Sequence, residues 1–204
     1  MERIIILGRG ESLKRIDELP NDIDTVILVN EWWPCKYGKS YGDDSMLENF
    51  LKDKKIILAC TPCIDIGNLS LFEKKFNVIE KYMNVFKSGK RRVSKPKKDW
   101  KHFPCTTQKI FNDIYDKLGI IYGSLFMACI LAHCHYKSKH IYIIGLDFYE
   151  KDYYLNQNYN YEQEKSESEK IKKNAVRFFK ELDCQFYIYT LANFECDNEN
   201  VFLK

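Results

Sequence analysis

Short apolar runs recur along this chain and alternate with longer segments whose apolar residues are spaced three or four positions apart. The runs are uninterrupted and rich in β-branched residues, which is typical of strands that are covered on both faces. We therefore predict strands at residues 3–7, 25–30, 55–59, 140–144 and 184–189.

The segments between these runs have the apolar spacing of amphipathic helices. One helix is expected to begin after the first strand, and the others to lie at residues 46–51, 71–86, 106–136 and 167–182. Glycines at 119 and 123 are expected to break the longest of them. Strands that alternate with helices form parallel sheets with right-handed crossovers. The pattern predicts an α/β fold: a Rossmann-like parallel sheet with helices on both faces.

Chain length and composition fit one globular domain. The 204 residues are 45% apolar and 30% charged, unlike a disordered or fibrous chain. We predict a single domain over residues 1–204, with candidate lid segments at 86–105 and 150–164. No apolar run approaches the roughly 18 residues that span a bilayer, and we find no export signal. A cytoplasmic protein with reduced cysteines is therefore expected.

Basic residues are concentrated in one stretch, although the formal net charge is only +3. The run from Lys87 to Lys101 has eight basic residues and one acidic residue, with Gly and Pro among them. It could be a lid that attracts phosphate, a nucleic-acid contact, or a solvated surface loop.

Candidate chemistry follows the strands, because ligands of parallel sheets bind beyond the carboxyl strand ends. After the first strand comes Gly8-Arg9-Gly10-Glu11-Ser12. Its glycines could let the backbone approach a phosphate at a helix N-terminus. The third glycine of the dinucleotide fingerprint is missing, so a plain tight turn with Ser12 as a helix cap is equally open.

Two further strand ends carry polar and aromatic groups. Asn30-Glu31-Trp32-Trp33 could read a ribose or base edge and stack on it, or could be a turn residue followed by core aromatics. Gly145-Leu146-Asp147-Phe148-Tyr149, followed by Tyr153 and Tyr154, could supply phenols that donate to a phosphate. Packing tyrosines and an Asp147 that caps a turn are the alternative there.

Nothing in the sequence favours a metal site. Cys60 and Cys63 form a lone CxxC, and His133 and His135 are two apart, so they point to different faces of a helix. Short acidic pairs in Gly- and Pro-containing loops are usually turns. We expect no metal and no cofactor.

Together these motifs resemble those of the family 42 glycosyltransferases, bacterial sialyltransferases that use CMP-sialic acid. The matching segments, in the family's order, are Gly8-Arg9-Gly10-Glu11-Ser12-Leu13-Lys14, Asn30, Tyr122-Gly123-Ser124-Leu125-Phe126-Met127-Ala128-Cys129, Gly145-Leu146-Asp147-Phe148-Tyr149 and Leu191-Ala192-Asn193-Phe194. The resemblance spans most of the chain, through short motifs.

The resemblance implies a role for each motif. The glycine turn and Asn30 would line the cytidine nucleotide, with Tyr122, Gly123 and Ser124 beside it. Tyr149 and one of Tyr153 or Tyr154 would hold the phosphate as it departs. Gly145 and Asp147 would complete the binding site.

Three positions depart from the family pattern. Arg9 stands where the family has Asn between the glycines, and Glu31 stands where it has Gln. The family's catalytic His, shortly before the last long helix, is absent, and Glu167 is the carboxylate that could replace it.

These features lead to one hypothesis with two alternatives. The chain is expected to bind a nucleotide sugar, CMP-sialic acid or similar, and to transfer the sugar to a hydroxyl acceptor without a metal, with activity reduced or lost if Glu167 is a poor base. The alternatives are a metal-dependent pyrophosphokinase-like enzyme and a non-catalytic protein that binds nucleotide or nucleic acid. Homo-oligomerisation is left open.

Overall fold

The computed structural model describes residues 2–33, 44–60, 68–83, 99–118, 124–151, 154 and 162–204. The strands are β1 (Arg3–Leu7), β2 (Thr25–Val29), β3 (Lys55–Cys60), β4 (Val78–Met83), β5 (Lys101–His102), β6 (His140–Ile144), β7 (Gln185–Tyr189) and β8 (Val201–Leu203). The helices are η1 (Glu11–Glu18), α1 (Ser45–Leu51), α2 (Leu69–Lys75), α3 (Cys105–Leu118), α4 (Ser124–Ile130), η3 (Leu131–His135), α5 (Glu162–Ser166) and α6 (Ser168–Phe179).

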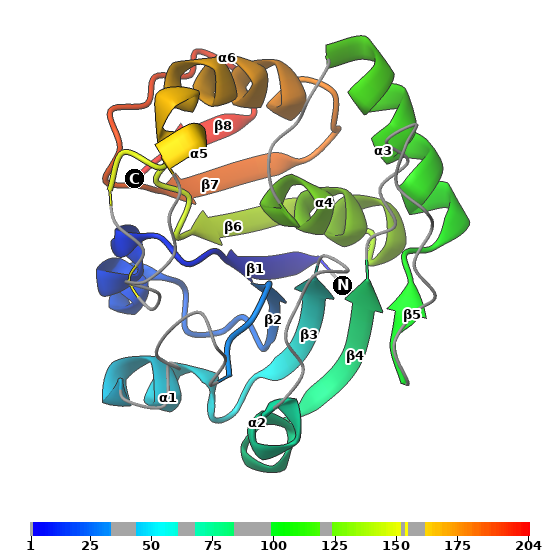
Figure 1. Cartoon of the computed structure of the whole chain (residues 1–204), viewed down its shortest axis with the longest axis vertical. Coiled ribbons are helices and arrows are strands. Elements are labelled where there is room, and N and C mark those ends of the chain that lie inside the picture. Colours follow the sequence, from blue (N-terminus) through cyan, green and yellow to red (C-terminus); the bar gives the residue numbers. More distant parts are fainter. Residues whose placement is uncertain are drawn as a thin grey trace.

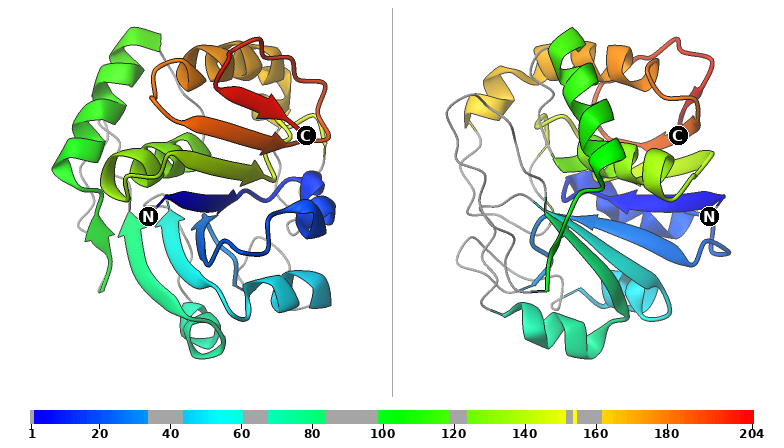
Figure 2. Two further views of the ribbon diagram at one scale, coloured as in Figure 1. Left: turned by 180° about the vertical axis from the view of Figure 1, so that it is seen from behind. Right: turned by 90° about the vertical axis from the view of Figure 1, so that its right-hand side faces the viewer.

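All the strands join one sheet, in the order β5-β4-β3-β2-β1-β6-β7-β8 (Figure 1). Every pairing is parallel. Figure 2 shows β1 in the middle, between the part of the sheet formed by β2 to β5 and the part formed by β6 to β8. The predicted fold class, a Rossmann-like α/β fold with a parallel sheet, is therefore confirmed.

Side chains that alternate along the strands divide the core into two layers. Ile4 and Ile6 of β1 pack in the layer that contains the apolar sides of α3, α4 and α6. Ile5 and Leu7 pack in the other layer, with η1, α1 and α2. All four side chains are fully buried. Burial on both sides explains why the last four residues of this strand are all apolar.

The prediction of one helix over residues 71–86 is wrong. Helix α2 ends at Lys75, Phe76 has an extended backbone (φ −127°, ψ 152°), and Val78–Met83 is strand β4. Val78, Ile79 and Tyr82 have high strand propensity, and the edge of β3 offers a partner for a parallel ladder. Non-local pairing therefore decided the structure of this segment.

Strands β5 and β8 were not predicted, and both are very short. The predicted helix over 106–136 is present as α3, α4 and η3, and its expected break near 119–123 lies outside the described residues. Within the described part of the chain, no helix has the length and apolar character needed to cross a membrane.

Candidate functional site

The strand order reverses between β1 and β6, which makes this the topological switch point of the sheet. Leu7 and Ile144, the last residues of these strands, are paired with each other. In open α/β sheets, ligands bind beyond the carboxyl strand ends at such a point. A pocket lies there, beyond both strand ends.

Most of the described residues that were predicted to form the site line this pocket. They are Gly8, Arg9, Gly10, Asn30, Ser124, Gly145, Asp147 and Tyr149. They come from the ends of β1, β2 and β6 and from the start of α4, so the fold brings four separate segments together. Ser12, Glu31, Tyr154 and Glu167 are described but are not part of the lining. Tyr122, Gly123 and Tyr153 lie outside the described residues.

The glycines of the site are required where the ends of β1 and β6 touch. The N–H of Gly8 donates to the carbonyl of Ile144 (2.8 Å), and that of Gly10 to the carbonyl of Gly145 (3.0 Å). A Cβ on Gly8 would lie 2.4 Å from the oxygen of Gly145, and Gly145 itself has a φ of 80°. Backbone packing thus accounts for these glycines without a ligand. Their use in phosphate binding stays a prediction.

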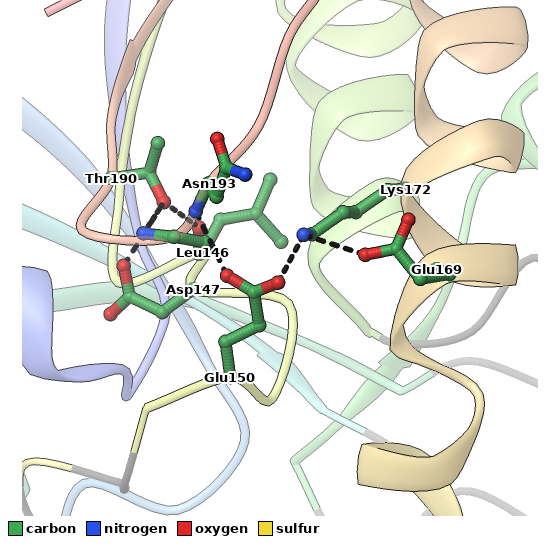
Figure 3. Close-up of polar contacts among 8 residues, drawn as sticks. Leu146, Asp147, Glu150, Glu169, Lys172, Thr190 and Asn193 are labelled. Carbon is green, nitrogen blue, oxygen red and sulfur yellow. Dashed lines mark hydrogen bonds and ion pairs between the residues drawn. The ribbon is translucent and has the colours of Figure 1, made fainter.

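Asp147 ties the end of β6 to two other segments, of which Figure 3 draws the one after β7. Its Oδ2 accepts a hydrogen bond from the N–H of Ser12 (2.7 Å), at the start of η1. Its Oδ1 accepts from the N–H of Leu191 (2.9 Å) and from the hydroxyl of Thr190 (3.1 Å), after β7. Asp147 is only 3% exposed and Ser12 is fully buried. Asp147 therefore caps η1 from a distant part of the chain.

The hydroxyl of Ser12 binds the backbone of the protein and does not line the pocket. Its hydroxyl oxygen accepts a hydrogen bond from the N–H of Gly145 (2.9 Å). The side chain does not cap its own helix, because the cap position is Gly10, which has no side chain to donate or accept. The expectation that Ser12 binds a ligand therefore finds no support in its position.

Asn30 presents its side chain at the end of β2. It has a φ of 64°, in the left-handed region that Asn tolerates better than most residues. Its Oδ1 accepts a hydrogen bond from the hydroxyl of Ser124 (2.8 Å), which is 5% exposed. Trp32 and Trp33, by contrast, are buried in the core, so the interpretation of these rings as core anchors is the correct one.

Arg9 and Glu31, the two substitutions relative to the family motif, contact each other. Arg9 Nη1 lies 3.5 Å from Glu31 Oε2, and both side chains are 11% exposed. A pair of amides in the family pattern is thus replaced here by a largely buried ion pair. Arg9 lines the pocket, so the exchange changes the electrostatics of the site and not only its packing.

The turn after β6 has an unusual backbone. The N–H of Glu150 donates to the carbonyl of Asp147 (2.9 Å), and both central residues of this turn have positive φ, 49° at Phe148 and 62° at Tyr149. For residues other than glycine, each such conformation costs roughly 1–2 kcal/mol. Phe148 is buried against the ring of Phe194, and Tyr149 lines the pocket. Backbone strain of this kind is concentrated at functional sites.

The sequence analysis missed several residues of the pocket wall. They are Val29, Leu125, Phe126, Leu146, Phe148, Lys151 and Ile171. Lys151 supplies a cation beside Tyr149, and its position just after the Gly-Leu-Asp-Phe-Tyr motif could have indicated it. No local signal in the sequence places Ile171 of α6 at the pocket, because only the packing of the helix on the sheet does so.

Tyr154 points its hydroxyl away from the pocket lining. The hydroxyl donates to Asp44, which also caps α1 by accepting from the N–H groups of Met46 (2.9 Å) and Leu47 (3.1 Å). Burial and this hydrogen bond raise the pKa of Tyr154 to about 12. The backbone N–H of Tyr154 donates to the carbonyl of Arg9 (2.8 Å). Tyr154 therefore supports the β1 turn, and Tyr149 is the phenol that the described part of the site presents.

Glu167 lies between α5 and α6, one helical turn before Ile171. Its carbonyl accepts from the N–H of Ile171 (2.9 Å). Its side-chain Oε2 and the hydroxyl of Ser168 are both buried without a hydrogen-bond partner in the part of the chain that the structure describes. An unpaired buried polar atom needs an explanation, and a bound ligand is one of the explanations.

The basic run and the two candidate lid segments lie only partly within the described residues. Of the segment from Lys87 to Lys101, the structure describes residues 99–101, and there Lys101 donates to Glu80 (2.7 Å) on β4. The remainder of both lid segments lies largely outside the described residues. No group of three or more potential metal-ligating side chains is found among the described residues.

Solved structures with the same fold are known, although no protein-family model and no curated protein matches the sequence. One neighbour is the sialyltransferase CST-II in complex with a trisaccharide acceptor and CMP, with a TM-score of 0.62, 20% identity, and coverage of 92% of this chain and 81% of that chain. Another is CstII from Campylobacter jejuni in complex with the substrate analogue CMP-3FNeuAc, with a TM-score of 0.56, 20% identity, and coverage of 93% and 80%.

This chain has a sialyltransferase-like fold. At such low identity the likeness extends to the fold alone, and the chain is not thereby assigned to the family. The agreement in fold covers most of both chains.

Proposed function

We propose that the pocket between β1 and β6 binds a nucleotide sugar, CMP-sialic acid or a similar donor, and that the chain transfers the sugar to a hydroxyl acceptor without a metal ion. One observation carries this proposal: the β1 turn, the amide of Asn30 and the phenol of Tyr149 line the same pocket. That pocket lies where ligands of this class of fold bind. The neighbour solved with CMP and an acceptor supports the choice of ligand.

In the proposed reaction, the acceptor hydroxyl oxygen forms a bond to the anomeric carbon of the sugar. The bond from that carbon to the phosphate oxygen breaks, and the phosphate leaves with the electron pair. The hydroxyl of Tyr149 and the ammonium group of Lys151, which line the pocket, are the groups that would stabilise the charge on the phosphate. The proton of the acceptor hydroxyl passes to a base.

Glu167 is the base in this proposal. Its side chain does not line the pocket, but its Oε2 is buried without a hydrogen-bond partner among the described residues, and it lies four residues before Ile171 of the pocket wall. A carboxylate is ordinarily a weaker base than the imidazole that the family pattern places before the last long helix. We therefore expect transfer to be slow or absent while donor binding, which does not depend on Glu167, is retained.

Thermal unfolding with a panel of nucleotides and nucleotide sugars tests the binding step. At about 100 times Kd, a ligand adds roughly 2.7 kcal/mol of stability, about 5–10 °C in Tm for a chain of this size. We expect such a shift with CMP, and we expect Asn30→Ala or Tyr149→Phe to reduce it by about half. Tyr187→Phe is the control, because that hydroxyl binds Gln185 on β7 (2.9 Å). The absence of a shift with every ligand would remove the proposal.

Two further measurements separate this function from its alternatives. If binding needs no metal, EDTA leaves the CMP shift unchanged, whereas loss of the shift would favour a metal-dependent phosphate-transferring enzyme. Transfer from CMP-sialic acid to a trisaccharide acceptor, the kind of acceptor bound in the neighbouring structure, is measured as the release of CMP. Glu167→Gln is expected to abolish any such release and to keep the thermal shift.

A further inference from the structure

The strained turn at residues 147–150 is held at both of its ends. Asp147 is bound by the segment after β7, through Leu191 and Thr190. Glu150, at the other end, accepts a hydrogen bond through Oε2 from the N–H of Asn193 (2.8 Å). Figure 3 shows that both carboxylates reach the same stretch of chain from opposite ends of the turn.

The second oxygen of Glu150 binds Lys172, which lies on α6 next to a residue of the pocket wall. Lys172 Nζ donates to Glu150 Oε1 and, at 2.9 Å, to Glu169 Oε1 (Figure 3). The side chain of Lys172 is 9% exposed and that of Glu169 is 77% exposed. Glu150 is therefore the partner that compensates the buried charge of Lys172, whereas Glu169 is a partner exposed to solvent.

The charges on this pair are retained despite burial. Burial by itself would lower the pKa of Lys172, but its hydrogen bonds to the two glutamates raise the pKa above the ordinary value. Burial would likewise raise the pKa of Glu150, and the hydrogen bonds from Lys172 and from the N–H of Asn193 lower it instead. A buried ion pair adds little stability compared with apolar side chains of the same size, and in some proteins such a pair fixes one conformation.

We propose that Lys172 is a positioning residue for the pocket. Through Glu150 it holds Phe148 and Tyr149 in their left-handed conformation and so keeps Tyr149 on the pocket wall. This contact between Lys172 and Glu150, here called the tether, joins α6 to the turn. Ile171, the residue before Lys172, lines the same pocket. The inference rests on the proposed function in one respect, that the ligand which Tyr149 meets is a nucleotide.

The tether is tested first without any ligand, by amide hydrogen exchange measured by NMR on the whole chain. In Lys172→Met, the amides of Glu150 and Asn193 are expected to exchange about tenfold faster, while those of Ile5 and Ile143 in the central strands keep their rates. Lys101→Met is the matched control, because it also removes a lysine from a glutamate, on β4. Unchanged exchange at residues 150 and 193 would overturn the inference.

The second measurement is the Kd for CMP by calorimetry in four proteins: the wild type, Lys172→Met, Tyr149→Phe and the double variant. We expect Lys172→Met to weaken binding about tenfold in the wild-type background and by less than about twofold in the Tyr149→Phe background, because it acts through that phenol. An equal loss in both backgrounds would mean a general structural effect and would contradict the proposal.

The outcomes for the two proposals are distinguishable. If the wild type binds no nucleotide, the proposed function fails, and the exchange rates alone still decide whether Lys172 holds the turn. If Lys172→Met does not fold, Glu150→Gln replaces it, because this variant keeps the size of the side chain and removes the charge that Lys172 meets. The same non-additivity with Tyr149→Phe is then required.

Discussion

Two polar clusters in this molecule are each centred on a glutamate that binds a lysine. After β6, Glu150 binds Lys172, and on β4, Glu80 binds Lys101. The two carboxylates have similar exposed fractions, 26% and 23%. The lysines differ: the side chain of Lys172 is 9% exposed, and that of Lys101 is 61% exposed.

The backbone around the two glutamates differs as well. Glu80 belongs to β4, whose register with β3 shifts between Val78 and Glu80, and whose ladder is made by backbone groups and not by the Glu80 side chain. Its other partners, the hydroxyls of Tyr82 and Tyr136, add contacts at the sheet edge. Glu150 instead closes a turn with two left-handed residues at a pocket. The same side-chain chemistry thus lies on a strand that is held by its backbone ladder in one place, and supports a strained turn in the other.

The largest difference between the two regions is expected on removal of a carboxylate. Asp147→Ala leaves the N–H of Ser12 buried without this acceptor and removes the partly buried bond from the N–H of Leu191, and we expect the free energy of unfolding to fall by about 3 kcal/mol. Glu80→Ala, at the sheet edge, is expected to cost about 1 kcal/mol. Urea denaturation of both variants measures the two losses. Equal losses would show that the turn needs no more support than the strand edge.

The sequence predicted the centre of the fold better than its edges. Residues 3–7 and 140–144 each have one polar residue followed by four largely apolar ones, and both segments are strands with the predicted bounds. Strand β4 carries Glu80 and Lys81, so its pattern resembles an amphipathic helix until the partner strand is known. Strand β8 has only three residues and exists through its pairing with β7. The central strands are specified by their own residues, whereas β4 and β8, which lie next to or at an edge of the sheet, depend on a neighbouring strand.

The site, like the fold, has a part that the sequence predicted and a part that depends on contacts between distant residues. The turns after β1, β2 and β6 were found because each motif directly follows a strand, and parallel strands bring such ends together. The contact between Lys172 and Glu150 was not found, because 22 residues separate them and charges on a helix usually face water. Contacts that hold a site in place are tertiary. A single sequence shows the two residues of such a contact but does not show that they meet.

A smaller effect tests whether burial or closeness to the pocket makes an ion pair important. Arg9 and Glu31 lie beside the pocket and their side chains are 11% exposed, close to the 9% of Lys172, but neither residue belongs to the turn at residues 147–150. We expect Arg9→Asn and Glu31→Gln each to cost about 1–3 kcal/mol, because one buried charge loses this partner. The double variant, which has the two amides of the family pattern, is expected to recover about 1–2 kcal/mol of the sum.

Denaturation of the wild type and the three variants gives this coupling energy from a double-mutant cycle. Additive losses would mean that the pair contributes through separate contacts rather than through its own attraction. In that case the pair of Arg9 with Glu31 and the pair of Lys172 with Glu150 would be alike only in their burial.

The smallest expected effect concerns acid and salt, and it compares the two glutamates directly. Hydrogen bonds from their partners lower the pKa of Glu150 and of Glu80, against the effect of burial. A carboxylate with a lowered folded-state pKa contributes stability above its unfolded pKa, about 4.3. That contribution disappears as the pH falls through the folded-state value.

Glu150→Gln and Glu80→Gln should therefore each make the loss of stability below about pH 4.5 shallower than in the wild type. In about 0.5 M NaCl the contribution of Glu80, under about 1 kcal/mol, should shrink, because Lys101 is exposed to screening ions. The contribution of Glu150 should persist, because Lys172 is shielded from them. Urea titrations at pH 3 to 6 and at two salt concentrations measure the contributions of Glu150 and Glu80 to the free energy of unfolding. If the two contributions were equally sensitive to salt, the difference in lysine burial would have no energetic consequence.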